Sequence, residues 1–282
     1  PQIVPSDKLV YSNVLLSFMW SMLLVIGAGI GGVFTYGFGT TADFLVDSAS
    51  YLVSAFFIYQ TFKEPLKTTS GETEASTEKK KNENMFIEGM RFLKNNPYFL
   101  AIALAKASGA FVWASAELYL IGYSADYFSS GGDSSLLVGV MLITSGIGVG
   151  LGPVIVQALI SDSDKNNRLM IAFGQFALFT GMIAMALINN LVIFLIFNAW
   201  RALGSGLIWI YSSSILQRRV PNKLMGRVTS FEFSMLLLAS CTTRVCYGLM
   251  LDEGQIHPRA AMMLYAAIGF VVCCAWVIFA LW

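Results

Sequence analysis

Uninterrupted apolar runs constrain this chain more than any other feature of its sequence. Several runs reach roughly 20 residues, the length at which a helix crosses the hydrocarbon core of a bilayer, about 30 Å thick. A helix satisfies its own backbone hydrogen bonds in that core, where water is absent. The chain is 56% hydrophobic and 12% charged, and a soluble domain carries about twice that charge. The sequence therefore predicts an all-α polytopic membrane protein.

About eight transmembrane helices are expected from the lengths of these runs, at residues 13–36, 41–62, 98–124, 135–160, 168–188, 190–217, 229–250 and 261–282. A long polar insert follows the second span, and its end places Phe86, Met90 and Leu93 at helical spacing. This piece either lies in the membrane interface or packs on neighbouring helices. Lys and Arg are concentrated in the insert and in two further loops, which lie on the same side of the membrane as the insert if the spans alternate in direction. The positive-inside rule therefore predicts that the insert is cytoplasmic.

The stretch GIGVGLGP, from Gly146 to Pro153, places four glycines at alternate positions inside an apolar run. On a helix, Gly146 and Gly150 lie one turn apart, and Gly148 and Gly152 lie one turn apart on nearly the opposite side. Each pair lets a neighbouring backbone come close. The first span has a similar pair, Gly27 and Gly31. Such contacts suit either static packing of a fixed bundle or sliding of one helix bundle against another.

Several charged residues interrupt the apolar runs, where an ionisable group needs a partner or a water-filled cavity. Lys106, Trp113 and Glu117 share one helix face. Either Glu117 exchanges protons with a cavity, or Lys106 reaches the cytoplasmic membrane surface and Glu117 the outer one. Arg201 lies near mid-depth, and it either compensates the charge of a ligand or clamps backbone carbonyls. Asn198 lies one turn before it, and Trp209 follows on the same span.

Two further charges have expected partners close in the sequence. Glu232 is expected to pair with Arg227, and Arg244 with Asp252 or Glu253.

Several classes of function are disfavoured by what the sequence contains. The single histidine, His257, excludes HExxH metalloproteases and sites with several histidines. The net charge of +1 gives no indication of nucleic-acid binding. No Walker motif or GxSxG elbow is present, so we expect no enzymatic activity, no metal and no cofactor.

Six stretches in order carry a family resemblance: VPSDKLVYSNVLLS, GAGIGG, FLVDSASYLVSA, FIEGMRFLKNNPYF, GIGVGLGP and ILQRRVPNKLMGRVTS. With them the chain resembles the major facilitator superfamily, whose transporters have twelve spans in two six-helix halves, and in particular its enterobactin-exporter and macrolide-efflux branch. The resemblance implies that the chain covers family helices 5–12, so that the N-terminal part of the fold is missing. Residues 1–62 would be the last two helices of the N-terminal half. Residues 63–96 would be a cytoplasmic linker with an amphipathic helix, and 97–282 the C-terminal six-helix half.

The resemblance also implies a function. We expect a multi-pass secondary transporter of the plasma membrane, an antiporter that couples proton entry to efflux of a small amphipathic, drug- or siderophore-like compound. Its partners would be the lipid bilayer and that compound, and the protein would be a monomer. The substrate and proton pathway would use Glu117, Arg201, Lys106, Trp113, Asn198 and Trp209. The gating loops would use Asp162, Arg168 and Arg227. The first and fourth spans would meet at the interface between the halves through Gly27, Gly31, Gly146, Gly148, Gly150 and Gly152. The alternative is a non-transporting protein, either a truncated product or an assembly partner.

Overall fold

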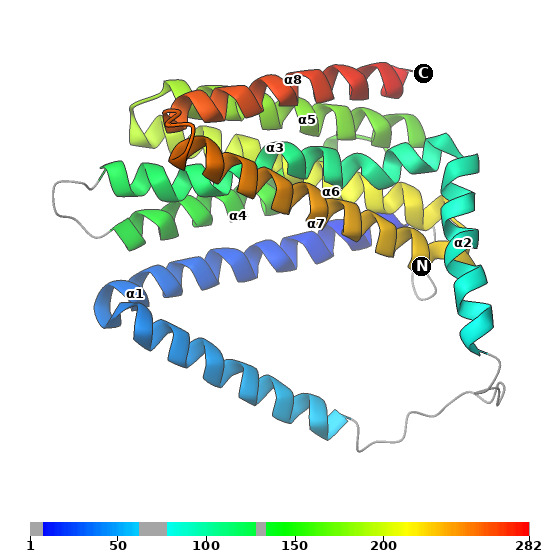
Figure 1. The fold of residues 1–282 in the computed structure, drawn as a ribbon, viewed down its shortest axis with the longest axis horizontal. Helices are drawn as coiled ribbons and strands as arrows, with labels where there is room; N and C mark the ends of the chain where they lie inside the picture. Colours follow the sequence, from blue (N-terminus) through cyan, green and yellow to red (C-terminus); the bar gives the residue numbers. More distant parts are fainter. Residues whose placement is uncertain (1–7, 62–77, 128–133, 282) are drawn as a thin grey trace.

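The computed structural model describes residues 8–61, 78–127 and 134–281, and within these ranges all regular secondary structure is helical (Figure 1). The centre of the expected linker, residues 62–77, lies outside the described residues. The helices are α1 (Leu9–Thr61), α2 (Glu78–Asn95), α3 (Pro97–Tyr127), α4 (Ser134–Leu159), α5 (Asp164–Leu187), α6 (Leu191–Arg219), α7 (Asn222–Asp252) and α8 (Pro258–Leu281).

Seven helices in the described part of the chain are long and apolar enough to cross a membrane. Helix α1 covers two of the expected spans, because its 53 residues would extend about 80 Å at 1.5 Å per residue. The two spans meet at Gly39, whose φ of 79° and ψ of 166° interrupt the helical backbone. A φ of this sign favours glycine. The Thr35 hydroxyl donates to the Asp43 carboxylate across the bend, at 3.1 Å.

The two arms of α1 have different surroundings. The first arm, residues 9–38, lies along the bundle and contacts α4 and α6, whereas the second, residues 40–61, diverges from it (Figure 1). Every residue from Phe44 to Gln60 is exposed. Most of these side chains are apolar, and such side chains are favoured in the hydrocarbon core of a bilayer rather than in water.

The bundle is formed by α3 to α8. Helix α6 packs on α4 and α5, α5 packs on α8, and α3 packs on α7. One hydrophobic cluster contains Leu207 and Tyr211 of α6. A second contains the rings of Tyr123 and Phe194, which stack with centroids 4.3 Å apart.

Helix α4 contacts its two neighbours through the alternating glycines. A Cβ added at Gly146 would lie 2.6 Å from the Val25 side chain of α1, and one at Gly150 would lie 2.7 Å from Cβ of Ser21. On the opposite side, added Cβ atoms at Gly148 and Gly152 would collide with α6, at the Ala199 carbonyl and the Leu203 side chain. The alternate spacing therefore brings α4 close to two helices at once. Gly146 and Gly150 face the first span as expected, whereas the expectation for Gly148 and Gly152 is wrong, because that side of the helix packs on α6.

The expected contact through Gly27 and Gly31 is not made. Nothing lies within 4 Å of a Cβ added at either position. Instead, Ala28 and Gly32 face α4, where a Cβ on Gly139 would lie 3.1 Å from the Ala28 carbonyl oxygen. The reason is the rotation of α1: the stripe through Ser21, Ala28 and Gly32 faces α4 and turns the GxxxG pair away.

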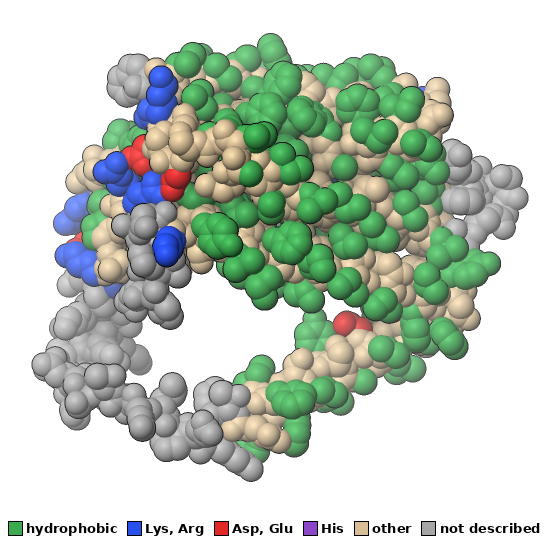
Figure 2. All heavy atoms as spheres, turned by 180° about the vertical axis from the view of Figure 1, so that it is seen from behind, with side chains coloured by type: hydrophobic (Ala, Val, Ile, Leu, Met, Phe, Trp, Pro, Cys, Tyr) green, Lys and Arg blue, Asp and Glu red, His purple; other side chains and the backbone are tan. Residues whose placement is uncertain are grey.

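Basic side chains gather at one end of the molecule, which we call the basic end; it holds Arg218, Arg219 and Lys223, and the flanks are hydrophobic (Figure 2). Helix α2 lies across this end (Figure 1). It is fixed there by the buried Leu93 and by an ion pair of 3.2 Å between Glu88 and Lys223. Of the two alternatives for this amphipathic piece, the structure shows packing on neighbouring helices.

Two glycine-to-alanine substitutions distinguish the effect of close backbone contact on stability from the effect of helix propensity. Gly148→Ala should lower the free energy of unfolding by about 1–3 kcal/mol, because the methyl group collides with α6. Gly27→Ala should change it by less than about 1 kcal/mol, because the space there is open and alanine favours a helix. Thermal unfolding of both variants in one detergent would compare them. Equal losses would contradict the account.

Candidate functional site

A cavity of about 760 Å³ lies between the first arm of α1 and helices α3, α4, α6 and α7. Helix α1 lines it with one stripe at helical spacing, which includes Asn13, Ser17, Trp20 and Leu24. The expected face of α3 also lines it, with Lys106, Trp113 and Glu117 together. Charged side chains are therefore brought into one cavity inside an apolar bundle.

Lys106 forms a buried ion pair with Glu232 of α7. Its Nζ lies 3.0 Å from Glu232 Oε1, and both side chains are only 3% exposed. The ammonium also donates to Ser213 Oγ at 2.8 Å, and it lies 4.3 Å from the ring centroid of Trp209. This arrangement corrects two expectations, since Lys106 does not reach the membrane surface and Glu232 pairs with Lys106 rather than Arg227.

Glu117 forms the second ion pair of the cavity, with Arg244 of α7. Arg244 Nη2 lies 2.6 Å from Glu117 Oε2, and the two side chains are 38% and 44% exposed. The guanidinium also lies 6.0 Å from the ring centroid of Trp113. The expected partners of Arg244, Asp252 and Glu253, are replaced by a carboxylate on another helix, because α3 and α7 pack side by side.

Arg201 lines the cavity and is only 4% exposed. Its Nη2 donates to Asn198 Oδ1 at 3.1 Å and to Ser145 Oγ at 3.4 Å. Within the described residues no carboxylate lies within 4 Å of its guanidinium. Gly181 of α5 lets the backbone of α6 approach closely at Arg201, since a Cβ added at Gly181 would lie 2.7 Å from Arg201 Cβ.

Asn198 has a different position from the other expected site residues. It is fully buried and does not line the cavity. Its Nδ2 lies within bonding distance of three acceptors on α4, the Met141 carbonyl (2.7 Å), Thr144 Oγ1 (2.9 Å) and Ser145 Oγ (2.9 Å). Asn198 therefore joins α6 to α4 and orients Arg201.

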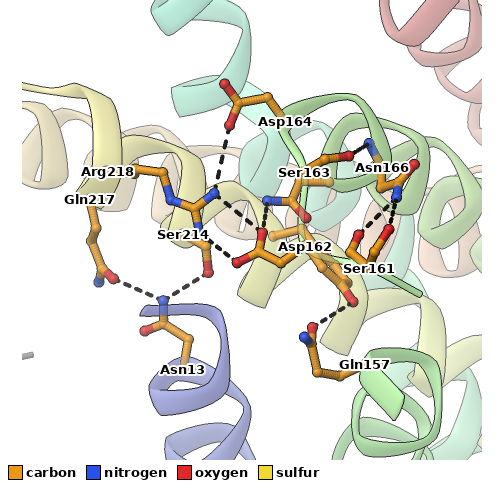
Figure 3. A network of polar contacts seen from close by, with 12 residues as sticks. Asn13, Gln157, Ser161, Asp162, Ser163, Asp164, Asn166, Ser214, Gln217 and Arg218 are labelled. Atoms are coloured by element: carbon orange, nitrogen blue, oxygen red, sulfur yellow. Dashed lines mark hydrogen bonds and ion pairs between the residues drawn. The ribbon is translucent and has the colours of Figure 1, made fainter. Parts of the chain in front are cut away.

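A polar network lies at the basic end of the cavity (Figure 3). Asn13 of α1 donates to Ser214 Oγ at 2.9 Å and to Gln217 Oε1 at 2.8 Å, both on α6. Close by, Arg218 binds Asp162 through both terminal nitrogens, at 3.2 and 2.6 Å. The network therefore connects α1, α6 and the α4–α5 turn.

The three expected gating residues are not brought together. Asp162 binds Arg218, whereas the Arg168 guanidinium lies 5.9 Å from the ring centroid of Tyr98 on α3. Arg227 lies on α7, where it donates to the Lys223 carbonyl at 2.9 Å and contacts α2 at Gly89.

Residues 2–242 match the family model described as Major Facilitator Superfamily. The chain belongs to the Major Facilitator Superfamily. It is therefore a membrane transporter by family, and its fold is a helical bundle of the superfamily type. A comparison with curated proteins gave no match.

Several cavity residues of this superfamily member were not expected at the site, among them Glu232, Ser213 and Phe233. One sequence signal could have indicated the two ion pairs. Lys106 and Glu117 are 11 residues apart on α3, and Glu232 and Arg244 are 12 apart on α7, with the opposite order of charge. Matched spacing of opposite charges in two apolar segments favours pairing between them.

Substitutions of the two cavity carboxylates should affect the stability of this superfamily transporter differently. Glu232→Gln should lower the free energy of unfolding by about 3–5 kcal/mol, because it leaves the buried Lys106 ammonium without its counter-charge. Glu117→Gln should lower it by less than about 1 kcal/mol, because its ion pair is partly exposed and screened. Thermal unfolding in detergent measures both.

The double variant Lys106→Met/Glu232→Met is the control for the buried pair, since replacement of both charges by apolar groups is close to neutral. It should recover most of the stability that Glu232→Gln loses. A double variant as unstable as the single one would show that the ion pair is not the cause.

Proposed function

We propose that the protein is a secondary active transporter that couples proton movement to efflux of a small amphipathic compound by alternating access. The observation that carries the proposal is the cavity, whose apolar and aromatic walls also contain the Lys106–Glu232 ion pair and Glu117, the partner of Arg244, within membrane-spanning helices. Ionisable groups at such depth are costly, and they commonly mark substrate or proton pathways. Membership of the superfamily supports transport in general.

Glu117 is the proposed proton carrier. Its side chain is 44% exposed beside the cavity, so it can exchange a proton with water there, whereas Glu232 is nearly inaccessible. Protonation removes the charge of Glu117 and breaks its ion pair with Arg244. Because these residues lie on α3 and α7, the proton state of Glu117 changes the link between two cavity helices.

The moving contact in this proposal is the one between α1 and α4. Their backbones touch at Ala28, Gly32 and Gly139, whereas the Val25 and Ser21 side chains of α1 pack into the gaps left by Gly146 and Gly150. Because α4 has no side chains at these glycines, a tilt of α1 separates few interlocked groups, and alternating access requires such a tilt. The hydrogen bonds of Asn13 to α6 form at the basic end, and they break when α1 tilts away.

Orientation and domain organisation complete the proposal. The basic end faces the cytoplasm of a plasma-membrane protein, since Lys and Arg favour that side, and export is therefore directed away from it. Residues 1–62 belong to the N-terminal half, 63–96 to the linker and 97–282 to the C-terminal half. The likeness of the six sequence stretches to the enterobactin and macrolide branch supports the substrate size and efflux.

One observation favours the alternative, a non-transporting assembly partner. The second arm of α1 has exposed apolar side chains along its whole length in the described chain. Transport by the purified protein alone separates the two functions, because an assembly partner would not move a substrate unaided.

Full-length protein in liposomes should transport amphipathic dyes when a proton gradient is imposed. In vesicles with an acidic interior, at least one of ethidium, Nile red and 8-anilinonaphthalene-1-sulfonate should accumulate inside. Nigericin in potassium buffer, which collapses the gradient, should abolish accumulation. Fluorescence of the entrapped dye measures the flux.

Glu117→Gln should remove the dependence on the gradient while dye exchange down its own concentration gradient remains. The control is Glu253→Gln, an exposed carboxylate at the opposite end from the basic residues, which should behave as the natural protein does. Dye movement that ignores nigericin would contradict proton coupling, and a failure to move any dye would favour the assembly partner.

A further inference from the structure

The ionisable side chains that line the cavity, together with their direct ion-pair partners, sum to one positive charge, because Arg244 pairs with Glu117 without lining the cavity itself. Its lining contains four ionisable side chains, Lys106, Glu117, Arg201 and Glu232. Glu232 neutralises Lys106 at 3.0 Å, and Glu117 is neutralised by Arg244 at 2.6 Å. Arg201 is left as a buried cation without a carboxylate within 4 Å in the described part of the chain.

The surroundings of Arg201 hold it in place but neutralise it only in part, because Glu117 attracts its charge from beyond 4 Å and is itself paired with Arg244. Nε and Nη2 bind the amide oxygen of Asn198, and Nη2 also reaches the hydroxyl of Ser145. Nη1 has no hydrogen-bond partner among the described residues, although Arg201 lines the cavity. An arginine side chain keeps its proton in proteins, and a buried charge without a counter-charge is costly. A ligand that supplies the missing anion would therefore gain binding energy there.

We propose that the transported compound is an amphipathic organic anion whose carboxylate or similar group binds Arg201. The inference rests on the proposed function and names its substrate class. The planar guanidinium offers two parallel donors to such a group. The apolar part of the compound lies against the tryptophans that line the cavity, Trp20, Trp113 and Trp209. Asn198 acts as a positioning residue, because it holds the guanidinium toward the cavity.

Three naphthalene compounds of similar size test this charge preference. They are 2-naphthoate, the neutral 2-naphthamide and the cationic 2-naphthylmethylamine. Calorimetric titration of full-length protein in nanodiscs, with empty nanodiscs as the control for lipid partition, gives each affinity. The natural protein should bind 2-naphthoate at least about tenfold more tightly than 2-naphthamide, the effect expected of a hydrogen-bonded charge.

Arg201→Gln should lose this preference while its affinity for 2-naphthamide stays within about twofold of the natural value. Retained binding of the neutral compound shows that the variant is folded. Arg201→Lys keeps the charge and should keep part of the preference. The control Arg259→Gln, far from the cavity and bonded to Asn189, should bind as the natural protein does.

Equal binding of the acid and the amide by the natural protein, or tighter binding of the amine, would overturn the inference whatever the variants do. A preference for 2-naphthoate that persists in Arg201→Gln would also overturn it. Because the titration needs no gradient, its result is independent of proton coupling. Dye transport with no preference for the acid would leave the proposed function intact and refute only the substrate class.

Discussion

Helix α4 has no side chains at four of the positions where it meets α1 and α6. In a bilayer, helices gain little from the hydrophobic effect when they associate, so close packing of backbones has to hold them together. The glycines at 146 and 150 allow this toward α1, and those at 148 and 152 toward α6. In the conformation that the structure shows, the two contacts set the distance between α1 and α6, and the cavity lies between them. The site therefore depends on the small residues of a helix that contributes little charge to it.

The cavity combines this packing with an incomplete balance of charge. Two ion pairs join α3 to α7: the Lys106–Glu232 pair is buried, and the Arg244–Glu117 pair is partly exposed. The exposed pair can respond to protons, and the buried pair fixes the two helices. Arg201 has neither role in the structure, because its partners are neutral dipoles on α4 and α6. In our proposal, proton coupling and ligand binding use different charges of one cavity.

Features that depend on the periodicity of the sequence, the spans and the helix faces, were predicted correctly. Features that depend on contacts between helices, the rotation of α1 and the ion-pair partners, were not. Apolar run length located the spans, the break near Gly39 and the shared face of Lys106, Trp113 and Glu117. Alternate spacing predicted two close-packed faces on α4. The rotation of α1 could not be predicted, because Gly27 and Gly32 are equally small and only packing selects between them. The partners of Glu232 and Arg244 were missed because local spacing was considered, whereas α3 and α7 meet across more than a hundred residues.

Movement of the first arm of α1 against the bundle of α3 to α8 is the central claim, and a distance between α1 and α7 tests it most directly. Spin labels at Tyr11 and Asn222, both exposed, would be placed in a variant whose four natural cysteines are replaced. Pulsed electron paramagnetic resonance in nanodiscs would then give the distances between them. The account predicts two populations whose ratio changes when the pH is lowered and changes less in Glu117→Gln. A single narrow population, unchanged by pH, would contradict it.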